Sequence, residues 1–364
     1  MSFQKKIIRL SWYSFIYLFV TLAVLAAVTL TLARMWLPSA TQYKSDVEQW
    51  VGQILEQQVV IKSMDADWYG FEPQLVLEGV QFLSKDGKAI ISDFARIKIG
   101  VDIFSSILQQ APVPGALVIE GARIVLVRQL DGSFSVSGFG SQASTDDSAT
   151  EASQVLEKWL LGQRLLKIQN SSLVWRDKQS HDEARLFSDV NFTLRNDGAR
   201  HQIEGSVFLP QDLGSHVLLF LDLRGNVFSS NDWSGNAQVT GVGLRLENWL
   251  SETVFQNIEL SKGLVSFSSW IRMQGARVTE LRGEILASDI QMRSLTSRRL
   301  SKIDSLSSDF SVQHQGDDWS LTADGLSLIY KGSAWKKMRV DSRLKRNKNV
   351  LEFEVSQLAI ENAV

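Results

Sequence analysis

Short runs in which apolar and polar residues alternate fill most of the chain after residue 59. A period of two is clear in residues 265–273 and 219–223, which is the spacing of a β-strand with one face buried. Asp-Gly pairs, which favour tight hairpin turns, separate several of these runs: Asp86-Gly87, Asp131-Gly132 and Asp197-Gly198. The pattern predicts a mainly β, mostly antiparallel fold of repeating hairpins.

One of these strands changes its facing part-way along. In LVIEGARIVL (117–126), Leu117 and Ile119 alternate, and the apolar alternation resumes at Ile124 after an odd interval. A β-bulge or a bend at Gly121 would explain the interval, because one irregular residue switches the facing of those that follow. We therefore expect a bend at Gly121, with Ile119 and Ile124 reaching the same apolar side.

The same irregularity recurs along the chain as two alternating apolar residues, then a turn-forming residue, then an apolar residue three positions on. The turn-forming positions of the seven copies are Gly79, Gly121, Asn170, Gly241, Asp289, Gly325 and Gln357. Seven copies indicate a repeated unit. A sheet bent at one level in successive hairpins would curve into a trough. The alternative is a pair of strands joined by a tight turn in an ordinary sandwich, and the pattern alone does not separate the two.

Three segments carry helical periodicity. Residues 43–55, within a predicted juxtamembrane segment 34–58, form one apolar stripe, which favours a helix covering the sheet over one that lies on a membrane or plugs a groove end. Residues 154–167 and 246–255 predict two more short amphipathic helices. Residues 140–153 are polar and small and predict a flexible loop.

The N-terminal segment predicts a membrane anchor. Residues 11–33 contain no charge over 23 positions, which as a helix would span about 35 Å and cross the hydrocarbon core of a bilayer. Basic residues within 1–10 predict a cytoplasmic tail by the positive-inside rule, with the bulk of the chain on the other side. A cleaved signal peptide is the competing interpretation, but its apolar run is normally shorter.

Composition argues against several classes of function. The formal net charge is -2, so the overall charge balance does not suggest a nucleic-acid partner. The chain has no cysteine and only four histidines, so thiol chemistry is excluded and a metal site is not expected. Nucleotide-binding, serine-hydrolase and zinc-protease motifs are absent from the sequence. The sequence predicts no enzymatic activity, no cofactor and no metal.

Residues 59–83, VVIKSMDADWYGFEPQLVLEGVQFL, resemble the N-terminal signature of the AsmA-like envelope proteins, in particular the YhdP type related to TamB. Further similar segments follow in the same order: ARIKIGVDIFSSIL (95–108), PGALVIEGARIVLVRQLDGSFSV (114–136), LEKWLLGQRLLKIQNSSLVWRD (156–177) and GVGLRLENWLSE (241–252). The resemblance covers nearly the whole chain, including the predicted anchor.

This resemblance implies a single-pass inner-membrane protein whose periplasmic part, residues 59–364, is a curved β-groove. Such proteins are held to carry phospholipid between the inner and outer membranes of Gram-negative bacteria, which supports the outer-membrane barrier. The implied partners are phospholipid acyl chains and the inner membrane. Outer-membrane or other envelope proteins are a further class of partner that the resemblance leaves open. Because the chain ends within a strand pattern, we expect it to be an N-terminal portion that continues further.

A sheet with one apolar face and few helices needs another cover for that face, and acyl chains would provide it. The residues expected to contact lipid in this groove are Leu117, Ile119, Ile124, Leu126, Ile168, Leu173, Trp175, Phe192 and Leu194. The second hypothesis is a structural or scaffold protein of the envelope with a dry β-sandwich core and a protein partner.

Overall fold

The computed structural model describes most of the chain from residue 42 onward. The described ranges are 19–21, 24, 31, 42–55, 58–69, 72–84, 87, 90–110, 113–132, 134–137, 163–179, 184–227, 232–249, 258–275, 277–315, 318–347 and 350–360. Within these ranges, β-strands dominate, as the alternation predicts.

All strands of the described part belong to one sheet of 17 strands. They are β1 (Gln58–Tyr69), β2 (Glu72–Leu83), β3 (Ile90–Val101), β4 (Pro114–Arg128), β5 (Phe134–Ser137), β6 (Leu165–Asp177), β7 (Arg185–Asp197), β8 (Arg200–Phe208), β9 (His216–Gly225), β10 (Trp233–Arg245), β11 (Ile258–Gln274), β12 (Arg277–Ser294), β13 (Leu300–Gln315), β14 (Asp318–Tyr330), β15 (Ser333–Ala334), β16 (Met338–Asn347) and β17 (Val350–Ile360).

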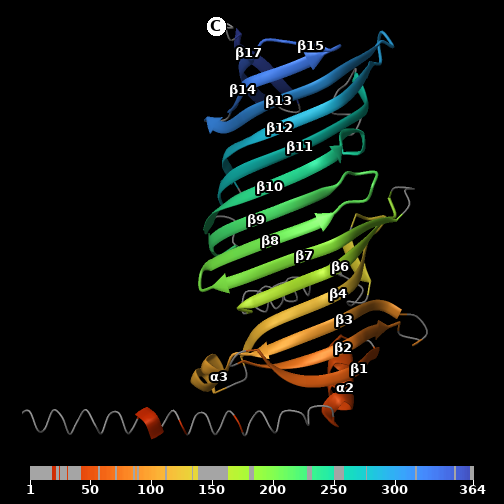
Figure 1. Ribbon diagram of the computed structural model, residues 1–364, viewed down its shortest axis with the longest axis vertical. Coiled ribbons are helices and arrows are strands. Elements are labelled where there is room, and N and C mark those ends of the chain that lie inside the picture. Colours follow the sequence, from red (N-terminus) through yellow and green to blue (C-terminus); the bar gives the residue numbers. More distant parts are fainter. Residues whose placement is uncertain are drawn as a thin grey trace, which may run out of the picture.

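The strands stack in the order of the sequence, from β1 at one end to β17 at the other (Figure 1). Neighbouring strands are antiparallel except β4 and β6, which pair in parallel. The short strand β5 pairs with β4, which also pairs with β6. In the same way, the short strand β15 pairs with β14, which also pairs with β16. The expected mostly antiparallel sheet of hairpins is therefore confirmed. The three Asp-Gly pairs fall between β2 and β3, β4 and β5, and β7 and β8.

In the part of the chain that the structure describes, three short helices accompany the sheet. Helix α2 (Lys44–Leu55) confirms the predicted helix of residues 43–55, and it lies at the β1 end of the sheet (Figure 1). Helix α3 (Ile103–Gln109) joins β3 to β4 and was not predicted. The single-turn 3-10 helix η2 (Leu246–Asn248) follows β10.

Three of the predicted non-strand segments are described only in part or not at all. Of the predicted helix 246–255, the described residues 246–249 contain the 3-10 turn η2, which directly follows β10, and the remainder lies outside the described residues. The predicted helix 154–167 is wrong at its end, where β6 begins at Leu165 and its pairing with β4 overrides the helical pattern. The predicted loop 140–153 lies outside the described residues.

The predicted anchor, residues 11–33, lies largely outside the described residues, of which it includes only 19–21, 24 and 31. Among the described residues, the structure contains no helix with the length and apolar character needed to cross a membrane.

A left-handed backbone conformation occurs within several strands. The residues concerned are Gly79 in β2, Gly121 in β4, Asn170 in β6, Asp189 in β7, Gly243 in β10, Asp289 in β12 and Gly325 in β14, whose φ angles lie between +47° and +64°. Five of them are turn-forming positions of the repeated pattern: Gly79, Gly121, Asn170, Asp289 and Gly325. The sequence therefore located most of these irregular positions correctly.

At Gly121 the structure confirms the expected bend and change of facing. Gly121 has φ +64° within the continuous strand β4. Ile119 on one side of it and Ile124 on the other both pack against the same apolar cluster, although an odd interval separates them. Leu77 and Val80 flank Gly79 in β2 in the same way. The left-handed residue therefore lets both halves of a strand face one side.

Gly79 and Gly121 must be glycines for a second reason as well. A Cβ on Gly79 would lie 2.9 Å from the Cβ of Lys62, and a Cβ on Gly121 would lie 2.8 Å from the Cβ of Ala95. Neighbouring strands approach too closely at the bend for a side chain to fit.

Two copies of the pattern differ in detail. In β10 the left-handed residue is Gly243 rather than the predicted Gly241, and the register with β11 shifts between Gly241 and Leu244. Gly243 donates its backbone N–H to Ser266 Oγ at 3.0 Å, which fixes the bend two residues later. Beside Gln357 the register between β16 and β17 also shifts, as expected for a bulge.

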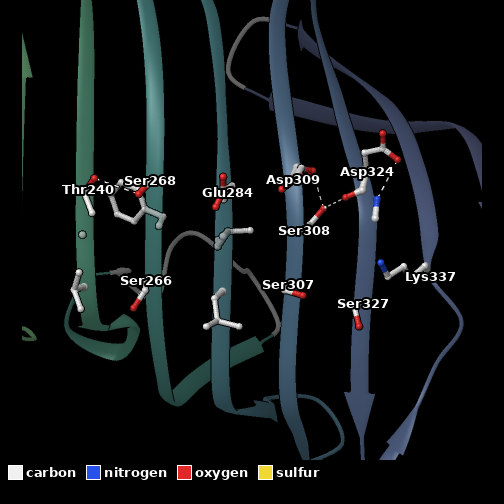
Figure 2. Close-up of a pocket in the computed structure, with 16 residues that line it drawn as sticks. Thr240, Ser266, Ser268, Glu284, Ser307, Ser308, Asp309, Asp324, Ser327 and Lys337 are labelled. Atoms are coloured by element: carbon white, nitrogen blue, oxygen red, sulfur yellow. Dashed lines mark hydrogen bonds between the residues drawn. The ribbon is translucent and has the colours of Figure 1, made fainter.

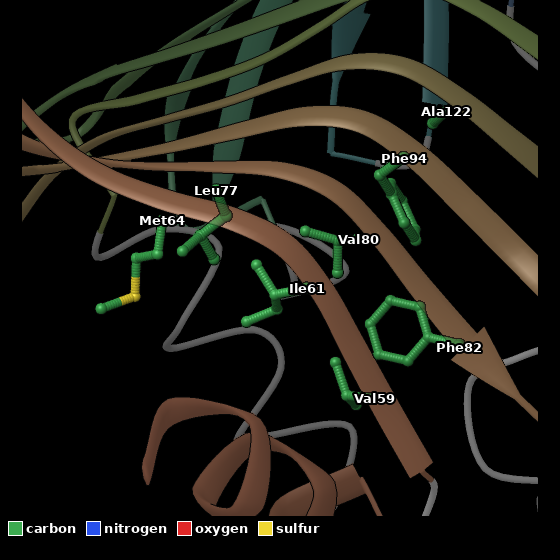
Figure 3. Packing of buried hydrophobic residues seen from close by; sticks show 8 residues of the cluster. All are labelled: Val59, Ile61, Met64, Leu77, Val80, Phe82, Phe94 and Ala122. Carbon is green, nitrogen blue, oxygen red and sulfur yellow. The ribbon is translucent and has the colours of Figure 1, made fainter. Parts of the chain in front are cut away.

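The best-packed core lies at the β1 end of the sheet (Figure 3). It joins β1 to β4 through the buried residues Val59, Ile61, Met64, Leu77, Val80, Phe82, Phe94 and Ala122. The strands arch over these side chains, and α2 lies beneath them, with Val47 and Val51 packed against the cluster. Glu48 of α2 accepts a hydrogen bond from the Ile61 backbone N–H at 2.7 Å. Helix α2 thus covers both the core and the edge strand β1.

Candidate functional site

Two lines of mostly apolar residues run across the sheet from β1 to β16, each residue paired directly with the next one in the neighbouring strand. The first line, the Ile119 row, consists of Met64, Leu77, Ile97, Ile119, Ile168, Phe192, Gly205, Leu219, Val239, Ser269, Gly283, Phe310, Ala323 and Val340. Only Gly205, Ser269 and Gly283 interrupt its apolar side chains.

The second line, the Leu117 row, lies two residues away on the same face. It consists of Ala66, Leu75, Ile99, Leu117, Leu166, Leu194, Ile203, Leu221, Ala237, Ile271, Leu281, Val312, Leu321 and Ser342. Only Ser342 is polar. With strands about 4.8 Å apart, each row extends for roughly 60 Å.

The residues between these two rows face the opposite side of the sheet and are mostly polar. This intervening line, the Val118 row, consists of Asp65, Val76, Lys98, Val118, Lys167, Thr193, Glu204, Phe220, Gln238, Trp270, Arg282, Ser311, Thr322 and Asp341. The sheet therefore has one apolar and one mainly polar face over its whole described length.

Two glycines on the apolar face, Gly241 and Gly283, lie beneath aromatic rings. A Cβ on Gly283 would lie 2.8 Å from Phe310 Cζ, and one on Gly241 would lie 2.7 Å from Phe267 Cε1. Each ring thus occupies the space that a neighbouring side chain would take. The apolar surface continues across these positions because the rings cover the glycine backbone.

The nine residues predicted to contact lipid all fall on the apolar face. Leu117, Ile119, Ile168, Phe192 and Leu194 belong to the two rows. The other four lie beyond the bend, where Ile124 pairs with Leu173 and Leu126 pairs with Trp175. Leu194 is buried and the other eight are partly exposed. Their contact with lipid stays a prediction.

The cover of the apolar face differs along the sheet. At the β1 end, Ile61, Met64 and Ala122 are at most 2% exposed beneath α2 and its neighbours. A second cluster, around Val265, Ala287 and Ile290, is packed mainly by strand residues, and Leu246 of η2 is the one residue of a described helix that contacts it. Both clusters are formed by strands that are neighbours in one sheet rather than by two sheets packed face to face.

The polar face carries a chain of ion pairs at the β1 end. Arg96 contacts Glu78 at 2.9 Å and Glu120 at 3.2 Å, and Lys98 contacts Glu120 at 2.9 Å. The hydrogen bond from Arg96 lowers the pKa of Glu78, and the hydrogen bond from Lys98 lowers the pKa of Glu120. These groups are partly exposed and link β2, β3 and β4 across the face opposite the core.

A hollow of about 650 Å³ lies further along, lined by residues of β10 to β14 and by Lys337 (Figure 2). Thr240, Ser268, Glu284 and Asp309 follow one another across four strands along it. By strand alternation they face away from the apolar rows. Several of its polar groups serve the bends: Ser308 Oγ donates to the backbone oxygens of Asp309 and Asp324. The lining also includes Phe267 and Ile285, which pack against the second apolar cluster, so the hollow combines polar and apolar side chains.

In the described ranges, no three His, Cys, Asp or Glu side chains come together in a way that could hold a metal ion. The apolar face offers a continuous surface of apolar side chains. Side chains without hydrogen-bonding groups can shelter hydrocarbon from water but cannot orient a reacting polar group.

Comparison with family models gives a match to the YhdP protein family over residues 1–364. The chain belongs to the YhdP family. No curated protein and no solved structure matches it. YhdP proteins are envelope proteins, and an open, curved sheet with an apolar face fits a lipid-transfer groove in general.

Sequence reasoning missed most members of the two rows outside β4, β6 and β7. The period-two alternation was visible in β9 and β11. This alternation could have predicted that Leu219, Leu221 and Ile271 share one face of their strands. It could not have predicted their alignment with Ile119 and Leu117. That alignment depends on the register of every strand pair, which a single sequence does not specify.

Proposed function

We propose that this YhdP-family chain is a lipid-transfer protein whose apolar face guides phospholipid acyl chains between the inner and outer membranes. The observation that carries the proposal is the pair of apolar rows running from β1 to β16. A dry core would need a second layer of structure along these rows, whereas a lipid groove needs only the rows themselves.

Physical scale supports this function. One acyl chain spans about half of the ~30 Å hydrocarbon core of a bilayer, so rows of roughly 60 Å would hold several lipids in succession. Sheltering each CH₂ group is favourable by about 0.8 kcal/mol. Because successive strands offer similar apolar side chains, a chain moving along the rows exchanges one contact for an equivalent one and meets no large barrier.

In this proposal the protein is anchored in the inner membrane by residues 11–33, and the sheet lies in the periplasm. The polar head group remains in water at the open edge of the groove, since neither apolar row offers it a charged partner. The protein provides a passive path without enzymatic chemistry, and the energy and direction of transport come from elsewhere.

Site-specific photo-crosslinking in cells tests the proposal. A photo-reactive amino acid placed at Ile119 should capture phospholipid, and one at the adjacent Val118, which faces the polar side, should not. Phe310 and Ser311 provide the same matched pair in β13. Capture at Leu173 would extend the lipid path beyond the bend in β6.

The outcomes separate the two hypotheses of function. Phospholipid captured at Ile119 and Phe310, but not at Val118 and Ser311, supports transfer along the rows. Crosslinks only to protein at Ile119 and Phe310, with Val118 and Ser311 silent, would contradict the lipid groove and favour an envelope scaffold. Equal lipid capture on both faces would also contradict it, because surface adsorption would explain that result.

A further inference from the structure

Helix α3 presents two apolar side chains to solvent at the tip of the β3–β4 hairpin. Leu108 is 86% exposed and Ile107 is 71% exposed. Two consecutive large apolar residues that are both exposed on a protruding element are unusual in a soluble domain. Such exposed apolar residues mark interaction surfaces. The exposed pair needs a partner.

The tip is held in a fixed conformation by hydrogen bonds at its base. Asp102 N–H donates to the Val113 carbonyl at 2.9 Å, so the two chains entering and leaving the tip are joined. Ser106 Oγ accepts from Val113 N–H at 2.9 Å and donates to the Asp102 carbonyl at 2.5 Å. The apolar pair is therefore presented on a preorganised turn, which lowers the entropic cost of binding.

The hairpin end is almost without charge. Between Lys98 and Glu120 the sequence contains a single charged residue, Asp102 at the start of α3. A protein partner would normally be selected by charged or hydrogen-bonding groups around an apolar centre. An uncharged, convex, apolar tip instead fits a partner that needs no matching shape, which is the hydrocarbon of a bilayer.

The tip connects two strands that carry the apolar face. Ile99 and Leu117, members of the Leu117 row, pair with each other in the two strands that carry α3. Figure 1 places α3 at the same end of the sheet as α2, the helix that follows the predicted anchor. A bilayer that contacts Leu108 would lie next to the beginning of the rows.

We propose that Ile107 and Leu108 insert into the surface of the inner membrane and dock the end of the apolar face on the bilayer. This inference rests on the proposed function, because docking gives lipid a sheltered path from the membrane to Ile99 and Leu117. The occupant of the exposed tip is the lipid bilayer itself.

Lipid-dependent quenching of a fluorescent label tests the insertion. The chain contains no cysteine, so Leu108→Cys creates a single labelling site in the full chain. Leu130→Cys is the matched control, because Leu130 is 75% exposed in the turn after β4, at the opposite end of that strand. Each labelled chain is reconstituted into phosphatidylethanolamine and phosphatidylglycerol vesicles with or without a quencher on the acyl chains.

The label at position 108 should be quenched at least about twofold by acyl-chain quenchers, and the label at position 130 should be unchanged. In Leu108→Cys, the further change Ile107→Asp should reduce the quenching, because a charge opposes insertion. Absence of quenching at 108, or equal quenching at 108 and 130, would overturn the proposal. A label at 108 that is shielded from water but not quenched by lipid would also overturn it, since protein would then cover the tip.

The quenching experiment can contradict membrane docking by α3 without contradicting the proposed transfer function. Lipid crosslinks at Ile119 without quenching at 108 would leave the transfer function in place and remove only the docking role of α3. Quenching at 108 without lipid crosslinks at Ile119 would support docking and contradict transfer.

Discussion

Two regions of the sheet bend in the same way but bury different amounts of apolar surface. In β2, Leu77 and Val80 flank Gly79 and are 4% and 2% exposed. In β12, Ala287 and Ile290 flank Asp289 and are 3% and 8% exposed. The β1 end gathers eight buried residues into its cluster, whereas the later region gathers three.

Helix α2 accounts for the difference. Both regions turn the two halves of a strand toward one face through a left-handed residue, but among the described residues only the β1 end has a helix of 12 residues packed against that face. The left-handed residue therefore places both halves of the strand on the apolar face. A separate element, helix α2, excludes water from that face at the β1 end. Beyond the β1 end, the described residues place no helix of this length on the apolar face, and the proposed function assigns that part of the face to lipid.

The largest expected effect comes from cutting the covered core. Ile61→Ala should lower the free energy of unfolding by about 2–5 kcal/mol, because Ile61 is 1% exposed within the packed cluster and its truncation leaves a cavity there. Ile285→Ala, at a partly buried position of the second cluster, should cost about 1 kcal/mol. Urea denaturation of the solubilised full chain measures both. Equal losses would mean that the two regions are equally well covered.

A second experiment breaks the shared bend. Gly121→Ala should cost about 2–3 kcal/mol, because a Cβ there combines a left-handed φ with a 2.8 Å approach to the Ala95 Cβ. Gly325→Ala is the matched control, since Gly325 has φ +58° but no atom within 4 Å of an added Cβ, and should cost about 1 kcal/mol.

Ala95→Gly should recover part of the loss in the Gly121→Ala variant and nothing in the Gly325→Ala variant, again measured by urea denaturation. If Ala95→Gly recovers neither variant, the close approach of β3 and β4 at the bend is not the cause of the loss.

A smaller effect is expected where α2 meets the edge strand. Glu48→Ala removes the acceptor of the Ile61 N–H and should cost about 1–2 kcal/mol, with faster hydrogen exchange in β1. Glu48→Gln keeps a carbonyl acceptor and should preserve most of the protection. Hydrogen exchange followed by mass spectrometry on β1 measures both. Unchanged exchange in Glu48→Ala would show that apolar packing alone holds α2 in place.

The smallest effect concerns the ion pairs on the polar face. Since the folded-state pKa values of Glu78 and Glu120 lie below the ordinary 4.5, their stabilisation is present above that pH and is lost as the pH falls through the lowered values. Arg96→Gln should therefore reduce the loss of stability on acidification, with only a slight effect near neutral pH because these side chains are exposed. Urea midpoints at about pH 7 and about pH 3 test this. An unchanged acid response in Arg96→Gln would contradict the assignment of Arg96 as the main cause at Glu78.

Much of the fold followed from local pattern. Alternation identified the strands, the stripe of residues 43–55 identified α2, and the irregular spacing at Gly121 located a bend that also gathers Ile119 and Ile124 on one side. These features depend on residues close in sequence, because strand facing and helix stripes repeat over two to four positions. Helix α3 escaped prediction because IFSSILQ carries no polar stripe to distinguish it from an apolar strand end.

The sequence by itself determined which residues of each strand are apolar and where most strands bend, since side-chain chemistry and the steric freedom of glycine, asparagine and aspartate act locally. Only the tertiary structure decided that Ile119 pairs with Ile168 in parallel, and that Phe192 and Leu219 continue the same row. A shift of one residue in any strand pair would turn its apolar side chains to the other face. The continuity of the rows therefore depends on many pairings between strands, whose registers are set across the sheet rather than by neighbours in sequence.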